Sequence, residues 1–489
     1  MPNQALAFHR VSKHVYDLTG LRTGSVRDQL LRSSLVTHCL VDEGLISRSQ
    51  KLLIFGAGAA GLNAAITAAD LGVFVDLIEI DKDPFGSFRL ASWRRIDPVE
   101  YDWPHDHFDA GVFPAGGAGI PLVQHTGSGD DLAILWAADW KAWDQTRNGR
   151  GHRGKVELLL STDARLFKPG IKEIAANGHV EVTGPWPSSV GGGNTTRTYG
   201  AVISCVGFGP ERTFDVHSPA RWNGYSGPSF WLDEDFISSG NVTPLGVDKV
   251  VISGGGDGGM QDFQRVVTGE FGKELLHKFN IAASGLSPSI DMASDAMLRA
   301  FLAAEDAGRR AYAWQRASQP ISLAMQAWHD AFASEVSKLF KHLKQVAIAQ
   351  LRQLAADILR PEILSGQLSV TWLYKDATPG YAYALNRYLS LVIQELAAIN
   401  ANQFSVPAVQ VLDSHEIVAI SPTYSTHSCS SSAGCFGVPH DVVLQSSTTK
   451  ATKQINDVGL IVVRHGAMPD PLLAGAAIRE QMTPFDLPQ

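Results

Sequence analysis

The chain has 489 residues, of which 45% are hydrophobic and 18% charged, so it can bury a substantial core and is too apolar for wholesale disorder. Its net charge of −8 argues against nucleic acid or an anionic membrane as a general partner. Four cysteines make no disulfide framework in a chain of this length. Because no apolar run is long enough to span a bilayer and no secretory signal opens the sequence, we expect a cytoplasmic protein.

Residues 1–50 are expected to form an N-terminal helical segment that packs on a sheet or on a partner subunit. The most informative stretch follows, from Lys51 to Asp81. An apolar strand runs into the turn Gly56-Ala57-Gly58-Ala59-Ala60-Gly61, a small-residue helix follows, and a second apolar strand ends at Glu79. This pattern predicts a complete βαβ unit of the dinucleotide-binding type.

Each glycine of this turn has its own purpose. Gly56 permits the tight turn, Gly58 lets the backbone approach a diphosphate, and Gly61 lets the helix pack closely on the strand. The diphosphate would lie on the free N–H groups at the start of the helix. Glu79 stands where a carboxylate can accept both ribose hydroxyls of an adenosine.

The next stretch, Asp83 to His107, is rich in proline, arginine and aromatic residues and is expected to form a long functional loop. A helix beginning at Asp130 or Asp131, short strands over 155–183 and a buried strand ending in Gly207-Phe208-Gly209-Pro210 follow.

A second strand, glycine turn and helix begin at Lys249, with the turn Gly254-Gly255-Gly256-Asp257-Gly258-Gly259. Asp257 complicates this turn, because a carboxylate beside a diphosphate is repulsive unless it points elsewhere. It could instead bind a hydroxyl group or cap the helix. No acid is seen at the end of a second strand soon after. The same run resembles the turn of spermidine-synthase-type and other S-adenosylmethionine-fold enzymes, which also need that acid.

Residues 290–360 are strongly helical in pattern and are expected to form an inserted subdomain that ends at Pro361. The chain then returns to strands, the last of which starts near Asp457 and ends in Arg464-His465-Gly466.

This order of motifs resembles the flavoproteins with two dinucleotide-binding domains: flavin-containing monooxygenases, N-hydroxylases and the pyridine nucleotide-disulfide reductase superfamily. The resemblance implies an α/β fold, with a Rossmann-like FAD-binding domain, a second Rossmann-like nucleotide-binding domain and a helical insertion. The expected layout is an N-terminal segment 1–50, the FAD domain from 51–215, the NAD(P)-like domain 216–289, the helical subdomain 290–365 and a return to the FAD domain over 366–489. The crossing strands end in VGFG and VRHG here, where these families usually have ATG.

The resemblance implies that the first turn binds FAD and the second NAD(P)H. The residues it assigns to the cofactors are Gly56, Gly58, Ala59, Ala60, Gly61, Glu79, Gly207, Gly254, Gly256, Gly259 and Gly466.

Candidate catalytic residues come from three places. The loop after Glu79 runs beside the flavin in the resembling families and contains Arg89, Arg94, His105 and His107. Asn386 lies on an otherwise apolar helix and could line a substrate cavity, or it could belong with Arg387 to a buried structural ion pair or to an exposed helix face. Arg464 and His465 could approach the pyrimidine end of the flavin, where a positive group stabilises its reduced anion, or could form a plain strand exit. Each loop residue could equally serve only to hold the loop.

The cysteines narrow the reaction, since a disulfide reductase needs two close thiols and no short pair follows the first βαβ unit. Cys205 is expected to be a buried small hydrophobe, and the region of His427, Cys429, Cys435 and His440 an ordinary loop without metal.

We therefore expect an FAD-dependent oxidoreductase, NAD(P)H-linked and similar to a monooxygenase or N-hydroxylase, acting on a small organic substrate. A flavin amine or amino-acid oxidase without NAD(P)H, an S-adenosylmethionine-fold transferase and a non-catalytic nucleotide sensor are the alternatives. The sequence leaves the substrate, the choice of NADH or NADPH and the formation of a homo-oligomer open.

Overall fold

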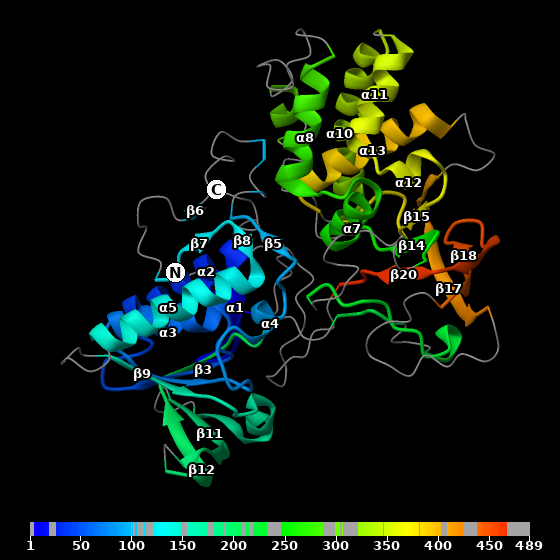
Figure 1. Cartoon of the computed structure of the whole chain (residues 1–489). Coiled ribbons are helices and arrows are strands. Elements are labelled where there is room, and N and C mark those ends of the chain that lie inside the picture. The colour runs from blue at the N-terminus through cyan, green and yellow to red at the C-terminus, as the bar shows by residue number, and fades with distance from the viewer. Residues whose placement is uncertain are drawn as a thin grey trace. The chain divides into compact units, whose positions relative to one another are not determined.

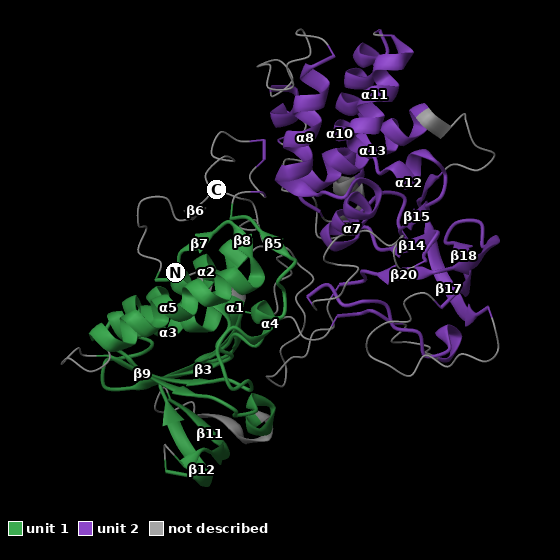
Figure 2. Cartoon of the chain, viewed as in Figure 1, with its two compact units in different colours: residues 1–99, 109–210, 467–489 green, residues 100–108, 211–466 purple. Residues whose placement is uncertain are grey.

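The computed structural model describes residues 4–18, 26–98, 100, 103–104, 112–113, 121–147, 154–174, 179–188, 191–207, 211–214, 219–231, 246–286, 299–303, 306, 321–345, 347–380, 382–401, 408–423 and 438–466. The chain divides into two compact units, which we call unit 1 and unit 2 (Figure 2). Unit 1 consists of residues 1–99, 109–210 and 467–489, and unit 2 of residues 100–108 and 211–466.

Unit 1 is built on a six-stranded sheet of order β1-β2-β13-β3-β4-β9. Its strands are β1 (Arg10–Ser12), β2 (Val15–Asp17), β3 (Lys51–Phe55), β4 (Phe74–Ile78), β9 (Lys155–Leu159) and β13 (Ala201–Ser204). All neighbours pair in parallel except β1 and β2. The short strands β5 (Arg95–Ile96) and β8 (Gly127–Ser128) form one small ribbon, and β6 (Val112–Phe113) and β7 (Gln124–His125) form another.

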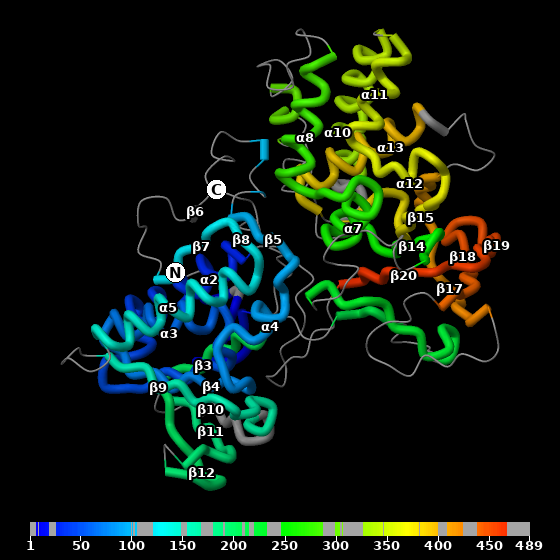
Figure 3. Tube along the Cα trace, in the orientation of Figure 1, coloured from blue at the N-terminus to red at the C-terminus, as the bar shows by residue number. Residues whose placement is uncertain are grey.

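Helices cover one face of this sheet and a small antiparallel sheet covers the other (Figure 1). The helices of unit 1 are α1 (Gln4–His9), α2 (Val26–Asp42), α3 (Ala59–Asp70), α4 (Gly86–Arg89) and α5 (Gly129–Arg147). The small sheet consists of β10 (Ile171–Ile174), β11 (His179–Trp186) and β12 (Gly193–Tyr199), preceded by the 3-10 helix η3 (Ala164–Gly170) (Figure 3). Apolar side chains of β3 and β4 pack there with Phe167, Val182 and Trp186 in one buried cluster.

Unit 2 is built on a four-stranded parallel sheet of order β16-β15-β14-β20. These strands are β14 (Lys249–Ser253), β15 (Ser369–Leu373), β16 (Val409–Leu412) and β20 (Leu460–Val463). Its helices are η5 (Pro219–Trp222), α7 (Asp257–Thr268), α8 (Gly272–Ser284), α10 (Ile321–Leu343), α11 (Ile348–Ile358), α12 (Pro361–Leu364) and α13 (Ala384–Ala401). A second antiparallel sheet consists of β17 (His415–Pro422), β18 (His440–Ser446) and β19 (Thr452–Val458) (Figure 3).

The two units repeat one plan. In each, the first strand leads through a glycine turn into a helix, and the parallel strands lie in the order third, second, first, fourth: β9-β4-β3-β13 and β16-β15-β14-β20. In each, a three-stranded antiparallel sheet is inserted between the third and fourth strands. The order reverses beside the first strand, which is where Rossmann-type sheets bind their ligands. The expected fold class is therefore confirmed.

Two parts of the expected layout differ from the structure. The N-terminal segment also contains β1 and β2, and β2 joins the main sheet because it pairs with β13 in parallel. We expected residue 366 onward to rejoin the first domain, but β15 and β20 hydrogen-bond directly to β14 and belong to unit 2. The expected helical insertion contains α10, α11 and α12. Within the described residues, no helix is long and apolar enough to cross a membrane.

Candidate functional site

The first glycine turn has the close packing that its sequence predicts. Gly56 has a positive φ of 89°, and a Cβ placed on it would lie 2.5 Å from the carbonyl oxygen of Cys205. A Cβ on Gly61 would collide with the carbonyl oxygen of Gly56. No described atom lies within 4 Å of a Cβ placed on Gly58. The turn is therefore tight on the protein side and open at Gly58, where a ligand needs close access to the backbone.

The helix that follows has an N-terminus of the kind that binds anions. Helix α3 begins at Ala59, and Gly58 precedes it with extended dihedral angles and no side-chain cap among the described residues. Ala59 and Ala60 present only methyl groups at the first turn of the helix. The N–H groups at such an end carry a partial positive charge and bind phosphate.

Glu79 follows the last residue of β4 and is 7% exposed. Its carboxylate accepts hydrogen bonds from the N–H of Ala57 at 2.5 Å and from the N–H of Asp81 at 3.0 Å. Burial raises the pKa of Glu79 above its ordinary value, partly offset by these two hydrogen bonds. The carboxylate is thus fixed beside the glycine turn. An FAD molecule fits these residues, with its diphosphate at Gly58 and its adenosine ribose at Glu79.

The second turn repeats this backbone geometry. Gly254 has a φ of 141°, and a Cβ on it would collide with the carbonyl oxygen of Arg464, which matches Cys205 in unit 1. A Cβ on Gly259 would collide with the carbonyl oxygen of Gly254. Gly256 stands before α7 with extended dihedral angles and no side-chain cap among the described residues. The three glycines therefore correspond to those of the first turn, and a dinucleotide fits here by the same criterion.

Asp257 does not point at its own helix end. One of its carboxylate oxygens accepts hydrogen bonds from the N–H of Tyr383 at 2.8 Å and from the amide of Asn386 at 2.7 Å, so Asp257 caps the start of α13. Burial raises the pKa of Asp257 to about 6, against the pull of these hydrogen bonds and of Arg387. Of the two roles expected for Asp257, capping is the one observed, but on a different helix.

Asn386 and Arg387 therefore belong to a buried cluster next to the second turn. Arg387 donates to the carbonyl of Gly380 at 2.7 Å, and its guanidinium lies 5.1 Å from the ring centre of Trp328. Burial, followed by the charge of Arg387, lowers the pKa of His329 to about 4, so this imidazole is neutral near pH 7. The structure supports the structural alternative for Asn386.

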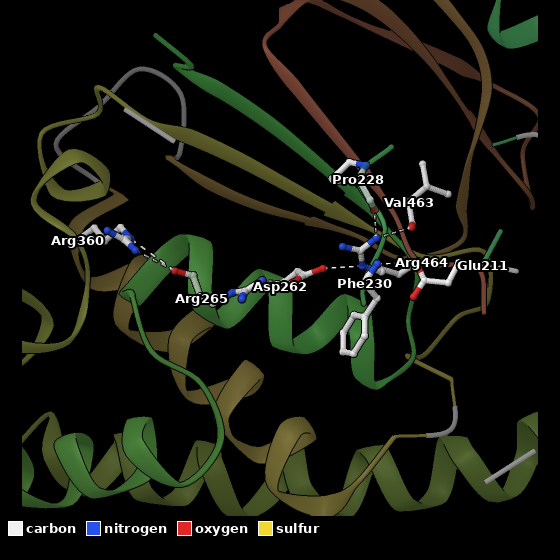
Figure 4. Close-up of polar contacts among 8 residues, drawn as sticks. All are labelled: Glu211, Pro228, Phe230, Asp262, Arg265, Arg360, Val463 and Arg464. Carbon is white, nitrogen blue, oxygen red and sulfur yellow. Dashed lines mark hydrogen bonds and ion pairs between the residues drawn. The ribbon is translucent and has the colours of Figure 1, made fainter. Parts of the chain in front are cut away.

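Arg464 forms a second buried cluster, with Asp262 and Arg265 of α7 (Figure 4). Its Nε lies 2.6 Å from Asp262, whose other carboxylate oxygen lies 2.7 Å from Arg265. Its Nη1 donates to the carbonyl of Pro228 and its guanidinium lies over the ring of Phe230. Sequence reasoning did not identify Asp262 and Arg265. Their spacing of three residues on a helix is typical of an ion pair and could have indicated them.

The structure also places the other candidate residues that follow the strands near the two turns. His465 Nε2 lies 2.8 Å from the hydroxyl of Ser253, at the end of β14. Gly207 and Gly466 follow the crossing strands β13 and β20, and both have a positive φ, of 80° and 79°. Glu211 accepts hydrogen bonds from the hydroxyl of Ser229 and the N–H of Phe230. The structure brings Gly254, Gly256, Gly259, Arg464 and His465 together around the second turn.

The loop after Glu79 is held by its own aromatic contacts. Phe85 and Phe88 lie 5.5 and 5.4 Å from Trp136 between ring centres, and Phe85 is fully buried. Arg89 donates to the carbonyl of Pro84 at 3.2 Å, and Arg94 is 2% exposed. His105 and His107 lie outside the described residues. Phe85, Phe88 and Arg89 therefore make contacts that hold the loop in place.

The described cysteines do not form a redox pair. Cys39 and Cys205 are both buried and unbonded to each other, and burial strongly raises the pKa of Cys205. A raised pKa suppresses the thiolate that redox chemistry needs. His427, Cys429 and Cys435 lie outside the described residues. His440 Nδ1 lies 2.7 Å from the carbonyl oxygen of Val438, and no cluster of potential metal ligands occurs in the part of the chain that the structure describes.

Comparison with known proteins adds a structural likeness only. No family model matches the chain, and no curated protein matches it. Solved structures similar to it include thioredoxin reductases, bacillithiol disulfide reductases and an L-lysine 6-monooxygenase.

Three of these structures are particular examples. A thioredoxin reductase from Lactococcus lactis is 11% identical and has a TM-score of 0.35, over 85% of this chain and 77% of its own. A bacillithiol disulfide reductase from Staphylococcus aureus is 11% identical with a TM-score of 0.37, over 87% and 80%. An L-lysine 6-monooxygenase from Pseudomonas syringae is 13% identical with a TM-score of 0.37, over 87% and 84%.

Proposed function

We propose that this protein is an FAD-dependent oxidoreductase that binds FAD in unit 1 and a nicotinamide dinucleotide in unit 2. The observation that carries the proposal is the repeated glycine turn, which has the same backbone geometry beside the first strand of each unit. Only unit 1 adds a carboxylate at the end of its second strand, which suits the tightly held adenosine of a resident cofactor.

The residues of unit 1 would divide the binding between them. The N-terminal N–H groups of α3 would hold the diphosphate, with Gly58 allowing its approach. The Glu79 carboxylate would accept both ribose hydroxyls, and its burial keeps water from competing. FAD, when bound, supplies the hydride and electron transfer, so the protein contributes binding, orientation and exclusion of solvent.

For the reaction, we propose a monooxygenase or N-hydroxylase-like activity on a small organic substrate. The two cysteines that the structure describes, Cys39 and Cys205, are buried and form no disulfide, which disfavours them as the redox pair of a disulfide reductase. A transferase of the S-adenosylmethionine fold is also disfavoured, since the residue after β15 is Tyr374 and not the acid such a site needs.

Anaerobic mixing of the purified protein with NADPH and with NADH tests this proposal. The flavin absorbance should bleach with one nucleotide and should recover on admission of oxygen. If neither nucleotide bleaches a flavin that a candidate amine or amino acid does bleach, the protein is an oxidase of the kind that needs no NAD(P)H.

A further inference from the structure

The second unit carries a tyrosine in the position that Glu79 holds in the first. Strand pairing fixes this correspondence, because Phe55 pairs with Ile78 just as Ser253 pairs with Leu373. The backbone N–H of Glu79 donates to the third strand at Leu159, and that of Tyr374 donates to the third strand at Leu412. The equivalent of Glu79 is therefore Tyr374.

Both side chains lie beside their turns. Glu79 is 7% exposed and Tyr374 is 8% exposed. Glu79 binds the N–H of Ala57, and the Cβ of Tyr374 lies 3.0 Å from a Cβ placed on Gly255, which matches Ala57. Tyr374 thus lies against the second turn, at the end that faces the adenosine ribose in a dinucleotide site.

A tyrosine and a carboxylate select different nucleotides at this position. A carboxylate accepts the two hydroxyls of a free ribose and repels a phosphate on the 2′-oxygen. Burial, and then the charge of Asp413, raise the pKa of Tyr374, so its hydroxyl stays neutral and can donate a hydrogen bond to a phosphate oxygen.

A positively charged side chain adjoins Tyr374 in the sequence. Lys375 follows directly, with a side chain 70% exposed and a surface ion pair to Glu416 at 3.2 Å. Exposed ion pairs of this kind are weak, so the ammonium group can turn to a phosphate dianion. Asp376 and Asp413 are the other charged groups at these strand ends, and both are exposed, where solvent screens their repulsion.

We propose that unit 2 selects NADPH over NADH, with Tyr374 and Lys375 receiving the 2′-phosphate. This inference rests on the proposed function only in that a nicotinamide dinucleotide occupies the second turn.

Calorimetric titration of the purified full-length protein with NADP⁺ and with NAD⁺ tests the inference by binding alone. We expect NADP⁺ to bind at least about 10-fold more tightly. The fragments 2′,5′-adenosine bisphosphate and 5′-AMP should show the same order, because they differ only at the group in question.

Variants assign the preference to the two residues. Tyr374→Glu should lower the NADP⁺ to NAD⁺ affinity ratio about 10-fold or more. Tyr374→Phe removes only the donated hydrogen bond and should lower the ratio by a smaller factor, about 2- to 10-fold. Lys375→Ala should weaken NADP⁺ about 3- to 10-fold and leave NAD⁺ unchanged. Lys453→Ala removes another surface lysine, whose Nζ donates to Gln410, and should change neither affinity. Circular dichroism checks that Tyr374→Glu is folded, and Lys375→Ala carries the test if it is not.

Equal affinities, a preference for NAD⁺, or no binding of either nucleotide would overturn the inference. Flavin content is read separately from the absorption spectrum. A flavin-free protein that prefers NADP⁺ would contradict the FAD proposal and still support the selection by Tyr374 and Lys375.

Discussion

Gly58 and Gly61 are only three residues apart, yet the structure constrains them in different ways. A Cβ on Gly61 would collide with the backbone of Gly56, whereas one on Gly58 would meet no described atom. The space at Gly61 is therefore filled by the protein itself, whereas the space at Gly58 is open to a ligand. The same substitution should therefore have separable effects on folding and on binding.

Gly58→Ala should leave the free energy of unfolding of the flavin-free protein within about 0.5 kcal/mol of the wild type, since Gly58 has extended dihedral angles that alanine adopts easily. Its affinity for FAD should fall at least about 10-fold, because the added methyl group stands between the backbone and the diphosphate. Gly61→Ala should instead destabilise the fold by about 1–3 kcal/mol through overpacking. Denaturant unfolding and FAD titration of both variants measure this, and equal unfolding losses would contradict the distinction.

Asp257 gives a pH dependence whose sign follows from its raised pKa. The folded state holds the proton more tightly than the unfolded state, so the stability from this group is full below about pH 4 and is lost as the pH rises through about 6. A shift from 3.8 to about 6 corresponds to about 3 kcal/mol.

Asp257→Asn removes this titration and keeps an oxygen that can accept from Tyr383 and Asn386. Between pH 4 and pH 8 the wild type should therefore lose up to about 3 kcal/mol of unfolding free energy relative to this variant. Denaturant unfolding at a series of pH values measures the difference. A difference that is constant with pH, or that changes in the opposite direction, would contradict the raised pKa of Asp257.

At this scale the sequence predicted much of the first turn and little of the second. The order and spacing of Gly56, Gly58, Gly61 and Glu79 lie within one short βαβ unit, so local pattern was sufficient. Asp257 instead takes its partners from Tyr383 and Asn386, more than a hundred positions away. No local pattern encodes such a contact.

Among the elements, a buried ion pair joins α7 to the residue that follows β20. Asp262 is fully buried on α7 and pairs with both Arg265 and Arg464, whose side chains are 4% and 5% exposed (Figure 4). One carboxylate thus compensates two buried guanidinium groups. A buried charge that loses its partner is strongly destabilising.

Asp262→Asn should lower the unfolding free energy by about 3–5 kcal/mol, because it removes the buried negative charge with which both Arg265 and Arg464 pair. Asp163→Asn is the matched control, since Asp163 pairs with Arg165 in an exposed ion pair and should cost no more than about 1 kcal/mol. Urea unfolding of both variants compares the two losses. Similar small losses would show that the buried pair adds nothing to stability.

The place of the second strand of unit 2 in the chain explains why no acid follows the second turn at the expected distance. In unit 1, α3 leads directly to β4, but in unit 2 the helices α8, α10, α11 and α12 come between α7 and β15. The position that corresponds to Glu79 therefore lies far later in the chain than in unit 1. The true position is Tyr374, which only the pairing of β14 with β15 identifies.

At the scale of the whole molecule, the chain passes repeatedly between the two units. The crossing after β13 lies near the expected boundary at residue 215, whereas the chain leaves unit 2 after β20 and not at residue 366. Residues 100–108 add a further excursion into unit 2. Trp103 in this excursion is 8% exposed and stacks on Tyr388, with ring centres 5.0 Å apart. Trp103 lies in the loop over 83–107 that the resemblance places beside the flavin. Its partners Phe301 and Tyr388 are so distant in sequence that composition alone could not reveal them.

Trp103→Ala should destabilise unit 2 by about 3–5 kcal/mol, because it empties a space between aromatic rings of the core. Trp93→Ala removes a 49% exposed tryptophan of the same loop and should change stability by no more than about 0.5 kcal/mol. Hydrogen exchange of α13 reports on unit 2 directly. Unchanged protection of α13 in Trp103→Ala would contradict its place in that core.

The absorption spectrum of the purified protein, together with identification of the cofactor released on denaturation, tests the FAD assignment most directly. A yellow protein that releases FAD, and loses it in Gly58→Ala, is the predicted result. A protein that is colourless and stays colourless after incubation with FAD would contradict the assignment of the Gly56–Gly61 turn and Glu79 to a flavin.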